Sequence, residues 1–183
     1  MHTDMTRLGV YTLAFTVLVA TSSIAIAAES TDGARRQIRT TDARLRTLLN
    51  EGLRTSPTLR ALVERLQASD VVVYLRCDGE FLSNTDGRLT FLSSAGGYRY
   101  VVVRMARLAS RVRQIAIMAH ELRHAVEIAD APDVVDGPSL VRAYQRIGYV
   151  NKSSPLPGIA FDSKAAIQAG IQVLRELLDD EED

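Results

Sequence analysis

A long helical pattern that contains two histidines constrains this chain more than any other feature. Between about residues 106 and 130, apolar residues recur at helical spacing, and the pattern stops at Ala131-Pro132, where proline blocks continuation. His120 and His124 lie four residues apart within this segment. On an α-helix that spacing gives about 40° of rotation and about 6 Å of rise, so both imidazoles project from one face. The pattern predicts a helix that presents two histidines together.

The residues around these histidines spell HELRH, an H-E-x-x-H motif. Two imidazoles on one helix face can bind one zinc ion at Zn–N distances of about 2.0–2.1 Å. Glu121 lies beside the first histidine, where its carboxylate can accept a proton from a water whose pKa the metal lowers. The only other histidine is His2. We therefore predict a zinc site with His120 and His124 as ligands and Glu121 as general base, rather than two unrelated polar histidines.

A catalytic zinc needs a third protein ligand and an open position, and three carboxylates compete for that role. Asp162 is the first choice because it begins the expected last helix, although capping that helix is an equally good use for it. Asp130 stands at the expected end of the histidine helix. Glu127 shares the histidine face, where it can also pair with Arg123. Cys77 ranks last among the possible ligands.

Two tyrosines lie between the histidine helix and the last helix. Tyr144 or Tyr149 can donate a hydrogen bond to a developing oxyanion, as a tyrosine does in some hydrolytic sites. Packing is the commoner use of such residues, so neither is counted as catalytic.

Residues 1–27 have the layout of a secretory signal peptide. Arg7 precedes an apolar run from Leu8 to Ala20, and Ala25-Ile26-Ala27 supplies a small-residue cleavage pattern. The run is short for a membrane span, which needs about 20 apolar residues, so we favour cleavage after Ala27 over a membrane anchor. We expect a secreted or periplasmic protein with one domain, residues 28–183, and no stable membrane span after cleavage.

Charge and cysteine content narrow the classes of partner. Lys and Arg total 22 and Asp and Glu total 22, so the formal net charge is zero. That balance gives no electrostatic reason to expect binding to nucleic acid or to an anionic membrane. The single cysteine, Cys77, cannot form a disulfide within the chain.

The remaining patterns predict an α+β fold. Two N-terminal helices are expected, one over about 38–53 and one from Ser56-Pro57, where serine caps and proline begins the helix. A small, mainly antiparallel sheet of three strands is expected over 71–75, 88–92 and 98–104. The histidine helix follows, and C-terminal helices start after Asp136 and near Asp162.

HELRH on a helix after a small sheet resembles the zincin clan of metallopeptidases, and the order of elements is similar to that of the small gluzincins (minigluzincins). The resemblance implies a zinc peptidase whose peptide or protein substrate lies extended beneath an edge strand, here 98–104. It also implies His120 and His124 as ligands and Glu121 as base. Arg123 stands where these peptidases usually have an uncharged residue. The alternative is therefore a non-catalytic, zincin-like binding or scaffold domain.

Overall fold

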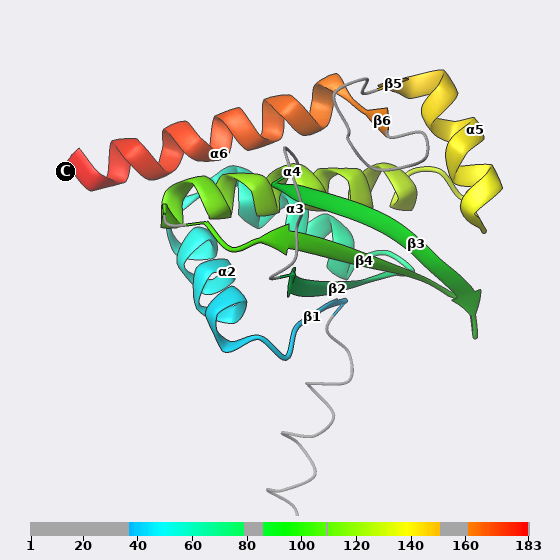
Figure 1. The fold of residues 1–183 in the computed structure, drawn as a ribbon, viewed down its shortest axis with the longest axis horizontal. Coiled ribbons are helices and arrows are strands. Elements are labelled where there is room, and N and C mark those ends of the chain that lie inside the picture. The colour runs from blue at the N-terminus through cyan, green and yellow to red at the C-terminus, as the bar shows by residue number, and fades with distance from the viewer. Residues whose placement is uncertain (1–36, 79–85, 109, 151–160, 183) are drawn as a thin grey trace, which may run out of the picture. The chain divides into compact units, whose positions relative to one another are not determined.

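The computed structural model describes residues 37–78, 86–108, 110–150 and 161–182 (Figure 1). The expected signal peptide and its cleavage site lie outside these residues. The chain from Arg36 to Asp183 makes up one compact unit. Among the described helices, none combines the length and the apolar character that crossing a membrane requires.

Five helices and a mixed sheet make up the described part of the chain, which is an α+β arrangement. The helices are α2 (Ala43–Thr55), α3 (Pro57–Gln67), α4 (Arg111–Ala129), α5 (Gly137–Ile147) and α6 (Lys164–Glu182). The main sheet contains β1 (Ile38–Arg39), β2 (Val71–Asp78), β3 (Gly87–Ala95) and β4 (Tyr98–Ala106). A separate two-stranded ladder joins β5 (Tyr149–Val150) to β6 (Phe161–Asp162).

The main sheet differs from the expected three mainly antiparallel strands, and that expectation is wrong. Its order is β1-β2-β4-β3, with parallel pairing of β1 to β2 and of β2 to β4, and antiparallel pairing only between β3 and β4. Strand β4 therefore lies inside the sheet, and the expectation that residues 98–104 form its edge is wrong as well. The physical reason is burial: Val101, Val102 and Val103 are all buried, as in the middle of a strand that has neighbours on both sides. The edge strands are β1 and β3.

Side-chain caps fix where the helices begin. Ser56 caps α3, as the sequence predicts. Helix α5 starts after Asp136, also as expected, and the Asp136 side chain closes a capping box there. Helix α4 begins at Arg111, later than expected, because β4 continues to Ala106 and Ser110 supplies the cap. Ile38 was expected in a helix but lies in β1. This strand has two residues, too few for an alternation of apolar and polar residues to be recognised in the sequence.

Helix α4 lies at the centre of the fold, between the sheet and α6 (Figure 1). Its side chains Ile115, Met118 and Leu122 are fully buried in the apolar core that it shares with the sheet. Helix α6 comes close to α4 because Gly170 has no side chain: a Cβ there would lie 3.2 Å from the Ala116 carbonyl oxygen. This packing brings the start of α6 beside the HELRH segment.

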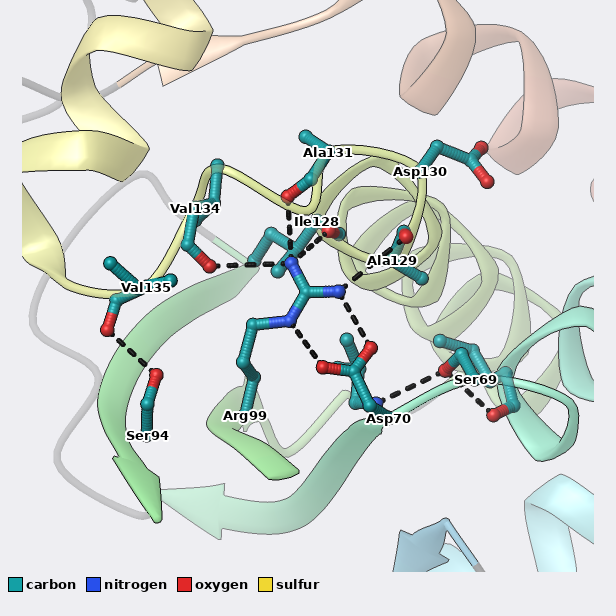
Figure 2. Close-up of polar contacts among 12 residues, drawn as sticks. Ser69, Asp70, Ser94, Arg99, Ile128, Ala129, Asp130, Ala131, Val134 and Val135 are labelled. Atoms are coloured by element: carbon teal, nitrogen blue, oxygen red, sulfur yellow. Dashed lines mark hydrogen bonds and ion pairs between the residues drawn. The ribbon is translucent and has the colours of Figure 1, made fainter. Parts of the chain in front are cut away.

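Arg99 joins the C-terminal end of α4 to the sheet (Figure 2). Its Nε and Nη2 atoms donate to the Asp70 carboxylate at 2.7 and 2.6 Å. Its Nη1 donates to the carbonyl oxygens of Ile128, Ala131 and Val134 at 2.6, 2.7 and 3.2 Å. The buried guanidinium thus adds donors for carbonyl oxygens at and just after the end of α4, where partners within the helix run out.

Candidate metal centre

The two histidines and one aspartate meet at the N-terminal end of α6. Helix α4 supplies His120 and His124, and β6 supplies Asp162. The Nε2 atoms of the two histidines lie 3.5 and 3.6 Å from Asp162 Oδ1, and one ligand atom from each of the three residues lies within 4.8 Å of the others. This group can hold a metal ion. The structure therefore brings together the three residues that the sequence predicts as ligands.

The spacing of these atoms fits a metal better than it fits direct hydrogen bonds. Normal N–H···O bonds measure about 2.7–3.2 Å, shorter than either Nε2 to Oδ1 distance. Ligand atoms about 2.1 Å from a tetrahedral zinc would lie about 3.4 Å from one another. Imidazole and carboxylate are also ligands that zinc accepts. The donor set and its spacing are therefore compatible with a zinc ion between Asp162 and the two rings.

Asp162 reaches this position through the short β5–β6 ladder, in which it pairs with Tyr149. Its carboxylate accepts a hydrogen bond from the Ser163 backbone N–H at 2.7 Å and one from the Tyr149 hydroxyl. The capping role belongs to Ser163, whose Oγ accepts from the Ala166 N–H at 3.0 Å. The Asp162 carboxylate therefore does not cap the first turn of α6 and faces the histidines.

Glu127, considered above as an alternative ligand, contacts His124 on the Nδ1 side of the ring, away from Asp162. Its Oε2 lies 3.0 Å from His124 Nδ1 and accepts from the Tyr144 hydroxyl at 2.9 Å, and its Oε1 accepts from Ser163 Oγ at 2.6 Å. A carboxylate on Nδ1 holds the proton there and leaves Nε2 free for a metal. Glu127 thus orients a predicted ligand, and the Tyr144 hydroxyl belongs to this buried network.

The pKa values in the group show that it favours a positive charge. Burial lowers the pKa of His124, but the carboxylates of Asp162 and Glu127 raise it by more, so that the pKa is about 9. Burial and the neighbouring His124 lower the pKa of His120. Burial raises the pKa of Asp162, and the neighbouring His124 and His120 side chains lower it more, so the net change is downward. A proton or a metal cation between the carboxylate and the rings satisfies this arrangement.

Glu121 lies beside the group, against the start of β3. Its side chain is buried, and burial raises its pKa to about 7. The Leu89 backbone N–H hydrogen-bonds to its carboxylate. Gly87 leaves room for this carboxylate, because a Cβ at that position would lie 2.7 Å from Glu121 Oε1. The edge strand therefore fixes the position of the predicted general base.

The other candidates lie away from the metal group. Asp130 stands at the end of α4 and pairs with Arg65 at 2.5 Å. Cys77 lies near the end of β2, where it packs partly buried against the core. Arg123 approaches Glu127, with its Nε 3.9 Å from Oε1, and is not part of the described pocket lining.

A pocket of about 510 Å³ opens onto the histidines between β3, α4, α5 and α6. The β3 side and the adjoining start of α4 contribute polar residues, among them Asp86, Arg88 and Arg113. The side formed by α5, β6 and α6 is apolar and contains Leu140, Val141, Phe161, Ile167, Ile171 and Leu174. The pocket thus combines a possible metal group, a buried carboxylate and an apolar wall.

The sequence analysis missed Gly87 and Ser163 as parts of this site. Gly87 directly precedes the expected strand 88–92, and a glycine at the start of a strand is a signal for close approach of another group. Ser163 follows Asp162 directly, and a serine before an apolar helix is a typical cap. Nothing in the sequence indicated its hydrogen bond to Glu127.

Replacing Glu127 by alanine is expected to weaken zinc binding about 10–100-fold, as loss of a carboxylate behind a metal-bound histidine generally does. The change removes the acceptor for His124 Nδ1 and leaves the Ser163 and Tyr144 hydroxyls without it. Competition with a chromophoric chelator measures the affinity. The exposed Glu64 on α3 provides the control Glu64→Ala, which should bind zinc as the wild type does. Equal zinc affinity of the two variants would show that Glu127 does not orient His124 for metal binding.

Comparisons of the chain with protein-family models, with curated proteins and with solved structures found no match. A functional interpretation therefore has to come from the chemistry of the residues themselves.

Proposed function

We propose that this chain is a zinc-dependent peptidase of the zincin type, exported to the periplasm or the exterior. The observation that carries the proposal is the meeting of His120, His124 and Asp162 beside the buried carboxylate of Glu121 at a pocket. Three protein ligands with an adjacent carboxylate are what hydrolytic zinc sites require. The HELRH resemblance and the signal-like N-terminus agree with this function.

Each residue has a defined part in the proposed hydrolysis of a peptide bond. Zinc, when bound, supplies a Lewis acid that polarises the scissile carbonyl and lowers the pKa of water. Glu121 accepts a proton from the water that attacks the scissile carbonyl carbon. It returns this proton to the amine that leaves when the peptide bond breaks. Gly87 and the Leu89 N–H keep that carboxylate in place, and Glu127 keeps His124 in its tautomer.

The pocket supports a peptide as the substrate. Strand β3 is an edge strand, and the backbone of an extended peptide can pair with such an edge. The apolar wall formed by α5, β6 and α6 suits an apolar side chain next to the scissile bond. Arg123, which motivates a non-catalytic alternative, turns to Glu127 and so leaves the described pocket lining free of its charge. A protein that binds zinc but cleaves no peptide would favour that alternative.

Measuring the metal content tests the proposal first. The protein purified without chelators is expected to carry one zinc per chain, and His124→Ala and Asp162→Ala should each lose it, because either change leaves only two of the three ligands. Mass spectrometry of the native protein gives the stoichiometry. Asp130→Ala is the matched control and should keep its zinc, since Asp130 pairs with Arg65 instead. A protein that takes up no zinc even when zinc is added would rule out the proposed function.

Replacing Gly87 by alanine is expected to lower kcat about 100-fold, with zinc retained. The new Cβ would lie 2.7 Å from Glu121 Oε1 and 2.9 Å from Ile117 Cγ2, so the carboxylate or the strand must move. A displacement of about 1 Å at a reacting group can cost a factor of that size. Kinetics on a peptide library and metal analysis measure both quantities. Gly137→Ala is the control, because no atom lies within 4 Å of a Cβ there. Equal kcat values for the two variants would contradict the role given to Gly87.

A further inference from the structure

Three arginines lie side by side across the face of the sheet that points away from α4. Arg76 on β2 pairs with Arg104 on β4, and Arg104 pairs with Arg88 on β3. Side chains alternate between the faces of a strand, and Val103 and Met105, on either side of Arg104, are buried in the core shared with α4. The three arginines, here called the arginine row, therefore share the outer face.

Among the described residues, Arg76, Arg88 and Arg104 have no carboxylate in ion-pair contact. Like charges directly opposite each other on neighbouring strands destabilise a sheet. Within the described ranges, none of the three forms an ion pair or a side-chain hydrogen bond, whereas arginines elsewhere pair with carboxylates, as Arg65, Arg111, Arg113 and Arg146 do. The formal net charge of zero thus hides a local excess of positive charge. An unbalanced row of this kind favours an anionic ligand.

One end of the arginine row lies at the pocket. Arg88 is half-buried and belongs to the pocket lining, directly after Gly87, which contacts Glu121. Arg76 and Arg104 are exposed and continue the row across the sheet, away from β3. A ligand bound along the row would therefore have one end beside the proposed reaction centre.

The length of the row indicates what kind of anion fits. Two gaps between neighbouring strands amount to about 9.6 Å, which is about three residues of an extended polypeptide. The guanidinium groups can bind carboxylates through paired hydrogen bonds. Long polyanions need an extended basic track, whereas the row spans only the three strands β2, β4 and β3. A short acidic stretch of peptide matches both the length and the charge.

We propose that the arginine row binds an acidic stretch of the peptide substrate and so selects peptides with several carboxylates near the cleaved bond. This inference rests on the proposed peptidase function for its choice of a peptide, but the binding surface itself is independent of zinc. Arg88 holds the carboxylate nearest the pocket, and Arg104 and Arg76 hold the more distant ones.

Fluorescence anisotropy can test the inference without turnover. The probe is a fluorescein-labelled peptide with three consecutive glutamates, compared with the same peptide carrying three glutamines, and the protein is Glu121→Gln. The glutamate peptide should bind more tightly, and Arg76→Gln with Arg104→Gln should weaken it about tenfold, the effect of losing two exposed ion pairs. Arg76→Lys with Arg104→Lys should keep most of the affinity, and Arg54→Gln, an exposed arginine of α2, should change nothing.

Folding and alternative ligands are separated by further measurements. Thermal unfolding of the double glutamine variant should be no lower than that of the wild type, because the change removes like-charge repulsion. Equal binding of the two peptides, or unchanged binding in the double glutamine variant, overturns the inference. Tighter binding of a sulfated polysaccharide, single-stranded DNA or anionic vesicles to the row would also overturn it.

The two proposals fail separately. Selective binding of the glutamate peptide by a protein that takes up no zinc would keep the acidic-peptide surface and remove the peptidase. Zinc-dependent cleavage with no preference for acidic peptides would keep the peptidase and remove the role of the arginine row.

Discussion

Replacing Glu121 by glutamine is expected to lower kcat about 10³-fold, the range that general acid–base catalysis contributes, while zinc stays bound. Glutamine has the size of glutamate and fills the same space against Gly87 and the Leu89 N–H. It cannot accept a proton from water, so the proposed hydrolysis loses its base. Glu121 is not among the three residues that can hold the metal, and the metal content should therefore not change.

Single-turnover kinetics on a peptide that the wild type cleaves measure the loss of rate in Glu121→Gln. Metal analysis of the same sample measures its zinc content. Glu64→Gln on α3 serves as the control for the loss of one carboxylate and should have wild-type kinetics. Full activity in Glu121→Gln would exclude Glu121 as the base and leave the metal group without its proposed reaction. Loss of zinc in this variant would instead show that Glu121 takes part in binding the metal.

Replacing Arg99 by methionine is expected to lower the free energy of unfolding by about 1–3 kcal/mol, the range for leaving buried hydrogen-bonding groups without a partner. The Arg99 side chain is only 6% exposed and donates to Asp70 and to the carbonyls of Ile128, Ala131 and Val134. Methionine fills part of the volume but donates no hydrogen bond. The three carbonyls at the end of α4 therefore lose a partner in a place that water reaches poorly.

Urea unfolding followed by circular dichroism measures this loss. Arg65→Met is the matched control: Arg65 also pairs with an aspartate near the end of α4, but both side chains are about half exposed, so the expected loss is about 0–1 kcal/mol. Equal losses in the two variants would show that the buried contacts of Arg99 contribute no more than a surface ion pair.

Lowering the pH should weaken the contact between Arg99 and Asp70, because the pKa of Asp70 is shifted downward in the folded protein. Hydrogen bonds from Arg99 lower the pKa of Asp70 below its ordinary value. A carboxyl group whose pKa is lower in the folded state stabilises the fold above its unfolded pKa, and this contribution is lost as the pH falls through the folded pKa. The Asp70 side chain is 42% exposed, so solvent screens the pair and the acid effect should be small.

The local features of the fold and site could be predicted from the sequence. The helix that carries HELRH, the cap at Ser56 and the capping box at Asp136 each depend on residues within one or two helical turns. The close approach of His120 and His124 follows from helix geometry alone. Such features depend on hydrogen bonds and side-chain spacing along one short segment, so the sequence is sufficient to predict them.

The pairing of distant segments required the tertiary structure. The sequence indicated strands at about the right places, but a mainly antiparallel sheet was expected, whereas β4 lies between β2 and β3 and pairs with β2 in parallel. Strand β1 has only two residues and is recognisable as a strand only through its pairing with β2. The free energy that selects these pairings comes from burial summed over the whole core, and a single segment does not carry that information.

The carboxylate that lies beside the two histidines, and the surroundings of Glu121, were decided in the same way. The sequence alone left Asp162, Asp130 and Glu127 as alternatives, each a carboxylate near a helix end or helix face. Packing of α6 on α4, with Gly170 at the contact, brings Asp162 to the histidines, while Asp130 pairs with Arg65 and Glu127 with His124 Nδ1. The sequence by itself determined the two histidines and the glutamate of the site, because one helix carries all three. Only the tertiary structure determined which carboxylate joins them, because that depends on how separate helices and strands pack together.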